Sequence, residues 1–208
     1  MINVSIAGVG GQGNVLAARI LAQAAMEKGW QVRGTETIGM AQRGGNVVSH
    51  VRMGNKNEEV FSPLPAKGSV DVLIALEPGE GARSLDLLKK DGVLVICKTG
   101  IPAVTAAWSK EIYQPMAVVE ELQNKGINVV VVDDQKLCNR LASRKCLNVI
   151  VLAYAIHAVN ALEELKTNAL SGQITLDDMN EAIPLCVKTK LVDINQRAIR
   201  IVKEMAEF

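Results

Sequence analysis

The run TIGMAQRGGNVVSHVRMG, from Thr37 to Gly54, decides the fold of this chain. It ends one expected strand, passes through an arginine and two glycines, and then alternates like a second strand from Asn46 to Met53. Only the nine residues 37–45 join the two strands, whereas a parallel crossover needs about a dozen or more. The sequence therefore predicts a sharp connection and a strand that runs antiparallel to a neighbour.

A glycine-rich turn precedes this run. The expected strand Ile2–Val9 leads into GVGGQG, residues 8–13, and a helical stripe over Val15–Lys28 follows. Glycines between a strand and a helix fit the G-x-G-x-x-G pattern, and amides at a helix N-terminus attract phosphate. Glu36, at the end of the expected strand Gln31–Thr37, lies about where a dinucleotide fold has its ribose-binding acid.

The glycine turn has three explanations. The glycines bind an anion or a partner, or they let the first helix pack tightly against the sheet, or they hold NAD or FAD. The short connection at residues 37–45 counts against the third explanation, because a dinucleotide fold needs a second crossover helix before its third parallel strand.

Composition argues against several classes of protein. The 208 residues carry a formal net charge of +1 and 3% aromatic residues, so neither a basic surface nor stacking rings favour nucleic acid. The most apolar stretch, 147–162, contains polar residues and is shorter than the roughly 20 residues that a bilayer needs. The N-terminus has no basic segment of a signal peptide. We expect a cytoplasmic protein without a membrane span.

The four cysteines, at positions 97, 138, 146 and 186, are widely spaced. No pair forms C-x-x-C, so the spacing predicts neither a zinc site nor an iron–sulfur cluster in this chain. Small core residues in a reducing compartment are their expected role.

The remaining pattern alternates strands and helices and then becomes mostly helical. It predicts an α/β sheet in the first two-thirds, covered by C-terminal helices, with no linker or internal repeat. The expected strands are Val70–Leu76, Val93–Lys98 and Ile127–Val132, and the expected helices are Arg83–Leu88, Pro115–Lys125, Gln135–Leu141, Cys146–Lys166, one capped by Thr175 with Asp178, and Leu191–Met205.

Arg43, between Gln42 and the pair Gly44-Gly45, is the most prominent side chain of the decisive run. A guanidinium on a flexible base suits a carboxylate or a phosphate. Composition alone favours a solvated loop arginine, so the residue pattern by itself leaves both roles open.

Taken together, the two motifs resemble a known family. GVGGQG before a helix, and GMAQRGGNVVSHVR at 39–52, resemble the small (beta) subunit of indolepyruvate:ferredoxin oxidoreductase, within the gamma subunits or domains of 2-oxoacid:ferredoxin oxidoreductases. Pyruvate and 2-oxoglutarate relatives share the GGQG turn and an R-G pair, whereas M-A-Q before Arg43 is similar to the indolepyruvate branch. DVLIALEPGEGAR at 71–83 and Asn195 extend the resemblance over almost the whole chain.

This resemblance implies a fold and a reaction. The fold is α/β, a three-layer α/β/α arrangement with a mixed, mostly parallel sheet and covering C-terminal helices, in a single gamma-type domain over residues 1–208. The reaction is oxidative decarboxylation of indole-3-pyruvate and other aryl pyruvates to acyl-CoA, with electrons passed to ferredoxin. Other branches of the family imply pyruvate, 2-oxoglutarate or branched 2-oxoacids instead.

The resemblance also implies that this chain is an accessory half. Thiamine diphosphate, magnesium and iron–sulfur clusters belong to a large alpha subunit, coenzyme A is the co-substrate, and ferredoxin is reached through the complex. This chain is expected to bind none of these cofactors alone and to be inactive alone. An isolated subunit can also pair with itself through the surface meant for its partner.

The expected cofactor-binding or subunit-interface residues come from the two motifs and the segment after the central strand. They are Gly10, Gly11, Gln12, Gly13, Gln42, Arg43, Gly44, Gly45 and Glu77. Glu77 follows a buried strand, where α/β sheets have ligand contacts, but a helix N-terminal acid is the favoured explanation. His50 is favoured as a structural histidine over a proton shuttle, His157 as a core residue, and Lys98 is a weak candidate for reaching an anion. No catalytic residue is assigned.

Two rival functions remain beside the resemblance. A free NAD(P)-dependent enzyme predicts a dinucleotide-induced rise in the melting temperature of the isolated protein. A non-enzymatic interaction module predicts partner binding while oxidoreductase activity is indifferent to changes in the arginine loop.

Overall fold

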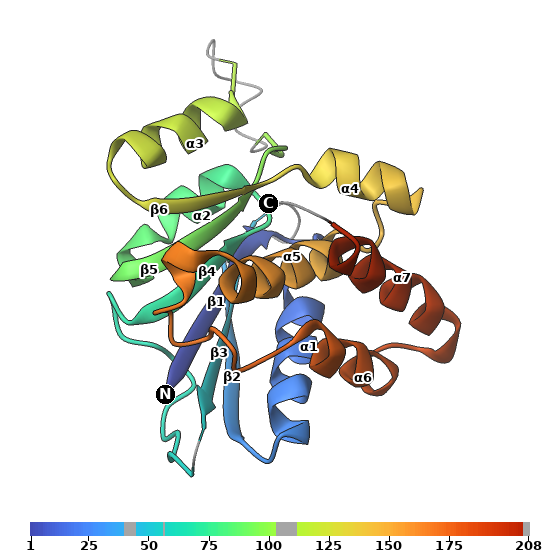
Figure 1. The fold of residues 1–208 in the computed structure, drawn as a ribbon. Helices are drawn as coiled ribbons and strands as arrows, with labels where there is room; N and C mark the ends of the chain where they lie inside the picture. Colours follow the sequence, from blue (N-terminus) through green and yellow to red (C-terminus); the bar gives the residue numbers. More distant parts are fainter. Residues whose placement is uncertain (40–44, 56, 103–111, 206–208) are drawn as a thin grey trace.

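One six-stranded sheet lies at the centre of the computed structural model, which describes residues 1–39, 45–55, 57–102 and 112–205 (Figure 1). The strand order is β2-β3-β1-β4-β5-β6. Every described pairing is parallel except those of β3, which runs antiparallel to both β1 and β2. The strands are β1 (Ile2–Val9), β2 (Gln31–Ile38), β3 (Asn46–Gly54), β4 (Val70–Ala75), β5 (Leu88–Cys97) and β6 (Asn128–Val132).

The predicted antiparallel strand is confirmed, and it separates two strands that a dinucleotide fold keeps together. Such a fold has the strand order 3-2-1-4-5-6, with the second strand beside the first. Here β3 lies between β1 and β2, and Ile6 of β1 and Glu36 of β2 face Ser49 of β3 from opposite sides. Glu36 is therefore two strand spacings, or roughly 10 Å, from the strand that leads into the glycine turn.

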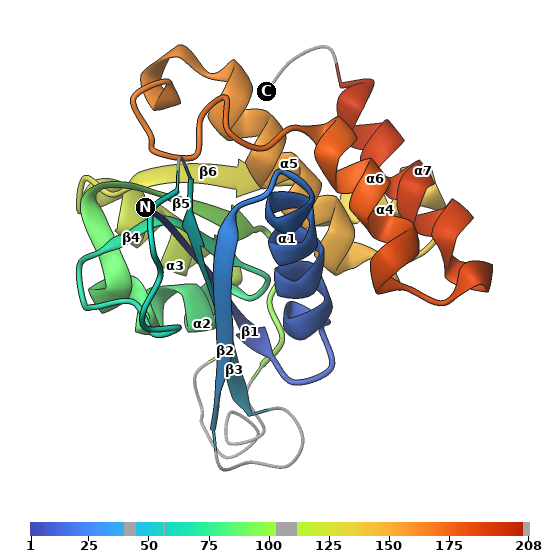
Figure 2. The same ribbon diagram turned by 90° about the horizontal axis from the view of Figure 1, so that it is seen from below.

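Helices cover both faces of the sheet, as predicted (Figure 2). On one face α1 and α5 lie next to the strands, and α6 and α7 pack outside them, while α4 contacts α5 and α7. On the other face α2 packs on β1, β4 and β5, and α3 packs on β6. The helices are α1 (Asn14–Glu27), α2 (Pro78–Arg83), α3 (Pro115–Asn124), α4 (Asp134–Leu141), α5 (Leu147–Ala161), α6 (Leu176–Cys186) and α7 (Val192–Lys203).

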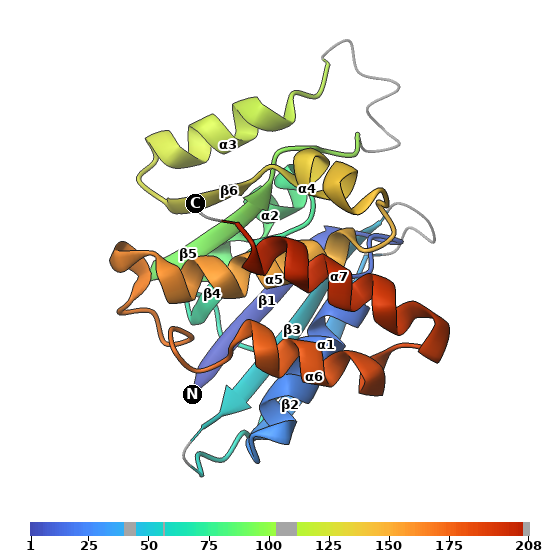
Figure 3. The same ribbon diagram turned by 45° about the vertical axis from the view of Figure 1, so that its right-hand side comes forward.

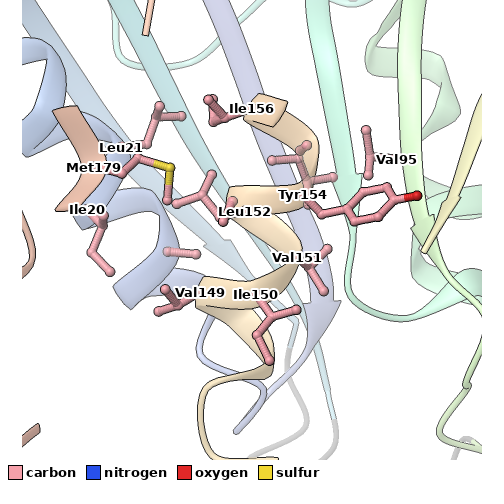
Figure 4. Close-up of a cluster of buried hydrophobic side chains, with 14 of the residues drawn as sticks. Ile20, Leu21, Val95, Val149, Ile150, Val151, Leu152, Tyr154, Ile156 and Met179 are labelled. Carbon is pink, nitrogen blue, oxygen red and sulfur yellow. The ribbon is translucent and has the colours of Figure 1, made fainter. Parts of the chain in front are cut away.

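The larger hydrophobic core lies around α5, which contacts α1, α4, α6, α7 and the sheet (Figure 3). Twelve of its 15 residues are buried, so the apolar stretch of the sequence is a core helix. In Figure 4, Leu152 of α5 lies among Leu21 of α1, Met179 of α6 and neighbouring apolar side chains. None of the helices in the described part of the chain combines the length and apolarity needed to cross a membrane.

The segment after β4 differs from the expectation. The predicted helix Arg83–Leu88 is wrong, because α2 begins at Pro78, directly after β4, and only a short 3-10 turn at Leu85–Leu87 follows it. Proline suits the first helical position, and Gly81 lets the helix approach the sheet closely. β5 also starts at Leu88 rather than Val93, because Leu88 pairs with Val70 across an irregularity in the register.

Two further boundaries test the expected C-terminal helices. α5 ends at Ala161 rather than Lys166, because Leu162 is extended and a 3-10 turn at Glu163–Leu165 follows. The predicted cap of α6 is confirmed as a capping box, in which the Thr175 hydroxyl accepts from the amide of Asp178 and the Asp178 carboxylate accepts from the amide of Thr175.

The close approach of α2 to β4 yields a stability prediction. A Cβ added at Gly81 would lie 2.6 Å from the Cβ of Ala75, so Gly81→Ala should lower the free energy of unfolding by about 1–3 kcal/mol. In the control Gly34→Ala, the added Cβ would lie 3.5 Å from the carbonyl oxygen of His50, an ordinary contact, and a change below about 1 kcal/mol is expected. Equal urea midpoints for the two variants would contradict this packing.

Candidate functional site

The carboxyl ends of the parallel strands β1, β4, β5 and β6 meet along one edge of the sheet, which we call the carboxyl edge. Open α/β sheets bind ligands outside these ends. The glycine turn follows β1, Glu77 follows β4, Thr99 follows β5, and Asp133 and Asp134 follow β6. Four separate segments of the chain therefore converge on the candidate site.

Gln12 holds the glycine turn in place. Its side-chain Oε1 accepts from the amide of Val9 at 2.7 Å, and its Nε2 donates to the carbonyl of Leu76 at 2.9 Å. The side chain thus joins the end of β1 to the end of β4. A Cβ at Gly8 would lie 2.7 Å from Gln12 Oε1, so the first glycine makes room for this connection.

Two backbone amides of the turn donate to carbonyl oxygens. Gly10 donates to the carbonyl of Gly45 at 2.9 Å, and Gln12 donates to the carbonyl of Val9 at 3.1 Å. Gly11 has φ +100, and no heavy atom lies within 4 Å of the position of its missing Cβ. Gly10 and Gly11 are both exposed, and glycine adopts the positive φ of Gly11 readily.

Gly13 brings two helix N-termini together. Its φ is +89, and an added Cβ would lie 2.7 Å from Nδ2 of Asn148, which donates to the Gly13 carbonyl at 3.1 Å. The start of α1 therefore packs directly against the start of α5. Tight packing, one of the three explanations of the glycine turn, applies at this position.

The arginine loop is described only at its end. Gln42, Arg43 and Gly44 lie outside the described residues. Gly45 is described, and its carbonyl accepts from Gly10 as the β1–β3 ladder continues past Val9 and Asn46. The two predicted motifs therefore meet at this hydrogen bond.

Glu77 caps α2, which is the explanation that the sequence favours. Its buried carboxylate accepts from the amide of Glu80 at 2.8 Å and from the hydroxyl of Tyr113. The same hydroxyl accepts from the amide of Gly79 at 3.0 Å. Burial, followed by the hydrogen bond to Glu77, raises the pKa of Tyr113, so the phenol stays protonated and the Glu77 carboxylate stays paired.

A second polar cluster at the carboxyl edge was not predicted. Asp134 is fully buried and accepts from the amide of Thr99 at 3.0 Å and from the Thr99 hydroxyl. Arg144 Nη2 lies 3.5 Å from Asp134 Oδ2 and 3.4 Å from Thr99 Oγ1. A signal existed in the sequence: Arg144-Lys145 stand just before the apolar helix α5, where the helix dipole disfavours cations.

The other candidate residues have structural partners. His50 is buried on β3 and its ring nitrogens lie 2.9 Å from Ser5 Oγ and 3.4 Å from Thr37 Oγ1, which supports a structural histidine. Lys98 pairs with Asp133 at 3.1 Å on the surface. Asn195 is buried in α7, and its side chain donates to the Leu191 carbonyl at 2.7 Å. His157 is partly buried on α5.

The residues that the structure describes do not form a metal centre. Among them, no group of three or more His, Cys, Asp or Glu side chains is arranged to hold a metal ion. Cys97, Cys138 and Cys146 are buried, and desolvation raises the pKa of each thiol, as is typical of small core residues.

The sequence profile described as pyruvate ferredoxin/flavodoxin oxidoreductase matches residues 3–204. The chain belongs to this family. Indolepyruvate oxidoreductase subunit IorB of Archaeoglobus fulgidus is 34% identical over 203 residues, which cover 96% of this chain and 92% of the relative. The pyruvate/ketoisovalerate oxidoreductases common subunit gamma of Pyrococcus furiosus is 28% identical and covers 100% of this chain and 98% of its own length. The family resemblance of the two glycine motifs is thus confirmed.

Solved structures share the fold of this chain. The keto/oxoacid ferredoxin oxidoreductase gamma subunit of Geobacter sulfurreducens has a TM-score of 0.64 and 20% identity, covering 98% of this chain and 97% of its own. The 2-oxoglutarate:ferredoxin oxidoreductase of Magnetococcus marinus has a TM-score of 0.66 and 15% identity. The match covers 100% of this chain but only 32% of the longer Magnetococcus marinus chain. The predicted α/β fold with a mixed sheet is confirmed.

The cap of α2 can be tested by substitution at Glu77. Glu77→Ala removes the acceptor for the Glu80 amide and leaves the Tyr113 hydroxyl without its carboxylate, so the free energy of unfolding should fall by about 1–3 kcal/mol. Tyr113→Phe should have a smaller effect, about 1 kcal/mol. Glu120→Ala, an exposed position on α3, is the control. Urea denaturation curves that coincide for Glu77→Ala and Glu120→Ala would rule out this role.

The buried His50 predicts a pH dependence. Burial lowers the pKa of His50, so below the usual value near 6.5 the unfolded chain takes up a proton before the folded one does. The stability that His50 contributes is present above that pH and is lost as the pH falls. We expect the free energy of unfolding to drop less between about pH 7 and pH 5 in His50→Gln than in the wild type.

His157→Gln is the comparison for this experiment, because burial also lowers the pKa of His157 and its removal should take away a separate part of the drop. If His50→Gln left the pH dependence of the free energy of unfolding unchanged, the pKa of His50 would be the same in the folded and the unfolded chain, which would contradict this prediction.

Proposed function

We propose that this chain is the small subunit of an indolepyruvate:ferredoxin oxidoreductase that completes the active site of a large subunit. One observation carries the proposal: the 34% identity to an indolepyruvate oxidoreductase subunit extends over nearly the full length of both chains. The reaction is oxidative decarboxylation of indole-3-pyruvate and other aryl pyruvates to acyl-CoA, with electrons passed to ferredoxin.

The cofactors of this reaction belong to the large subunit in our proposal. Thiamine diphosphate with magnesium supplies the carbanion chemistry and iron–sulfur clusters carry the electrons. In this proposal the small subunit binds and orients, while the large subunit supplies the cofactors. The small subunit is accordingly inactive alone.

The glycine turn and the arginine loop form one rim of the active-site entrance in this proposal. The bond from the Gly10 amide to the Gly45 carbonyl supports it, because it brings the end of the arginine loop against the turn. Gln42, Arg43 and Gly44 would continue from Gly45 toward the large subunit. Coenzyme A phosphates or the substrate carboxylate would meet the Arg43 guanidinium there. Glu77 supports this edge by fixing the start of α2.

Exposed isoleucines at the carboxyl edge support a contact with a partner. Ile38 at the end of β2 is 67% exposed, Ile101 after β5 is 47% exposed, and Ile112 before α3 is 86% exposed. Exposed apolar residues along one edge of a sheet are consistent with a protein interface there. In the absence of the large subunit the same surface would serve a homodimer.

The substrate class has a second candidate. The gamma relative from Pyrococcus furiosus serves pyruvate and ketoisovalerate oxidoreductases and covers the whole chain at 28% identity, which favours pyruvate or branched 2-oxoacids as the alternative. The 2-oxoglutarate enzyme supports only the fold at 15% identity. A free NAD(P) enzyme is disfavoured by β3, which separates Glu36 from the glycine turn.

We propose a cytoplasmic location and a single gamma-type domain for residues 1–208. The four cysteines are free, three of them buried, as expected in a reducing compartment. The described strands belong to one sheet with helices on both faces, which supports one domain.

The central experiment is co-expression with the large subunit and an assay of coenzyme A-dependent reduction of a ferredoxin-like dye. Aryl pyruvates should be turned over faster than pyruvate or branched 2-oxoacids. Arg43→Ala should leave the fold intact and lower kcat/KM about tenfold or more, because a charge-assisted contact to an anion is lost.

Arg33→Ala is the matched control for this substitution, since Arg33 is an exposed arginine on the edge strand β2. A complex of the two chains whose turnover and coenzyme A affinity do not change with Arg43→Ala would refute the role of the arginine loop. A wild-type complex without 2-oxoacid activity would refute the proposed function itself.

A further inference from the structure

β2 is the outermost strand on one side of the sheet, and among the described residues only β3 pairs with it (Figure 2). Six of its eight residues are exposed, and its register with β3 is continuous from Gln31 to Ile38. The strand contains no proline, and its one acidic and one basic residue cancel in charge. Native edge strands are usually shortened, bulged or interrupted by proline to prevent further pairing, so β2 is unusually open to another strand.

The last hydrogen bond of the β2–β3 ladder shows which backbone groups face the free edge. The amide of Gly39, directly after β2, donates to the carbonyl of Asn46 at 2.8 Å. Because hydrogen-bonded pairs alternate along an antiparallel ladder, the odd-numbered residues of β2 turn their amides and carbonyls toward β3. The even-numbered residues turn theirs outward. These are Val32, Gly34, Glu36 and Ile38.

The charges of β2 restrict how a second copy of this chain can pair with the free edge. In two antiparallel copies related by a two-fold axis, opposed side chains lie on the same face of the sheet. An axis at Arg33 would oppose two guanidinium groups, and an axis at Glu36 would oppose two carboxylates, both of which are unfavourable. An axis at Gly34 would oppose Val32 to the carboxylate of Glu36. Three of the four central registers are therefore disfavoured.

An axis at Thr35 avoids these conflicts. It opposes Thr35 to Thr35 of the second copy, which is a favourable cross-strand pair, and Val32 to Ile38, which are both apolar. Ile38 is 67% exposed in one chain and would be covered by the half-buried Val32 of the other. In the same register Gly34 faces Glu36, so every outward amide and carbonyl of β2 meets a partner.

We propose that the free edge of β2 binds the same edge of a second copy of this chain, with the two-fold axis at Thr35. The two sheets then become one continuous sheet, and the interface is closed because each copy uses the same surface. The ends of β4, β5 and β6 lie beyond β1 from this interface and stay free for a large subunit. The inference concerns β2 alone and does not depend on the proposed function.

Glu36→Pro tests the edge without disturbing the ladder to β3, because the Glu36 amide points outward and an edge strand accepts proline at such a position. We expect the isolated full chain to sediment as a dimer, and Glu36→Pro to weaken this association about tenfold or more. Glu36→Thr keeps the amide, so it is the matched control and should remain a dimer. Urea midpoints measured in parallel show that both variants are folded.

Cysteine substitutions test the register. With the axis at Thr35, the two Thr35 residues form a non-hydrogen-bonded pair whose Cα atoms lie about 4.5 Å apart, within the range of a disulfide. Thr35→Cys should therefore cross-link two chains on oxidation. Arg33→Cys is the control, because Arg33 opposes Thr37 and lies about 13 Å along the strand from its own counterpart. The unsubstituted chain gives the background from the native cysteines.

Loss of the dimer in Glu36→Pro, together with cross-linking of Thr35→Cys, supports the proposal. A monomeric wild-type chain, equal association of Glu36→Pro and the wild type, or cross-linking of Arg33→Cys but not of Thr35→Cys overturns it. A dimer that is lost in Ile101→Asp but kept in Glu36→Pro would also overturn it, because the copies would then meet through the isoleucines of the carboxyl edge. Turnover of 2-oxoacids is measured separately, so a β2 dimer without that activity would refute only the proposed function.

Discussion

The antiparallel insertion of β3 between β1 and β2 is the constraint on which the rest of the structure depends. It takes the position beside β1 that a dinucleotide fold gives to its second parallel strand. It also carries Gly45 to the Gly10 amide, so the end of the arginine loop occupies the neighbourhood of the glycine turn. The glycine turn, which matches the dinucleotide-binding pattern, therefore contacts the end of the arginine loop instead.

Each glycine of the turn has a different structural role. Gly8 makes room for the Gln12 side chain, Gly13 allows α1 to meet α5, and Gly11 is exposed with a positive φ. The G-x-G-x-x-G pattern alone cannot distinguish these structural roles. They depend on residues that are distant in the sequence, such as Asn148 and Leu76. Tight packing at Gly13 is therefore compatible with the anion or partner contact that we propose for the turn.

Local pattern predicted most of the fold. The six strands, the antiparallel direction of β3, the buried α5 and the capping box at Thr175 all follow from alternation, connection length and end signals. The errors lie where long-range contacts override local pattern. α2 starts earlier than expected because Glu77 caps it with the help of Tyr113, and β5 starts earlier because Leu88 pairs with Val70.

The candidate site was only partly predictable for the same reason. The expected strand ends were enough to predict the glycine turn and Glu77 as candidates. The hydrogen bond between Thr99 and Asp134, however, joins the ends of two strands 35 residues apart, and only the pairing of β5 with β6 brings them together. Arg144-Lys145 could have been found from the sequence alone, as cations at the start of a helix that no acid compensates.

The split between β1 and β2 also affects the order in which the chain can assemble. During synthesis α1 and β2 emerge before β3, yet β2 has no described neighbour in the sheet except β3. The edge strand β2 therefore stays unpaired until residues 46–54 have left the ribosome. Only then can β1, β3 and β2 form their part of the sheet.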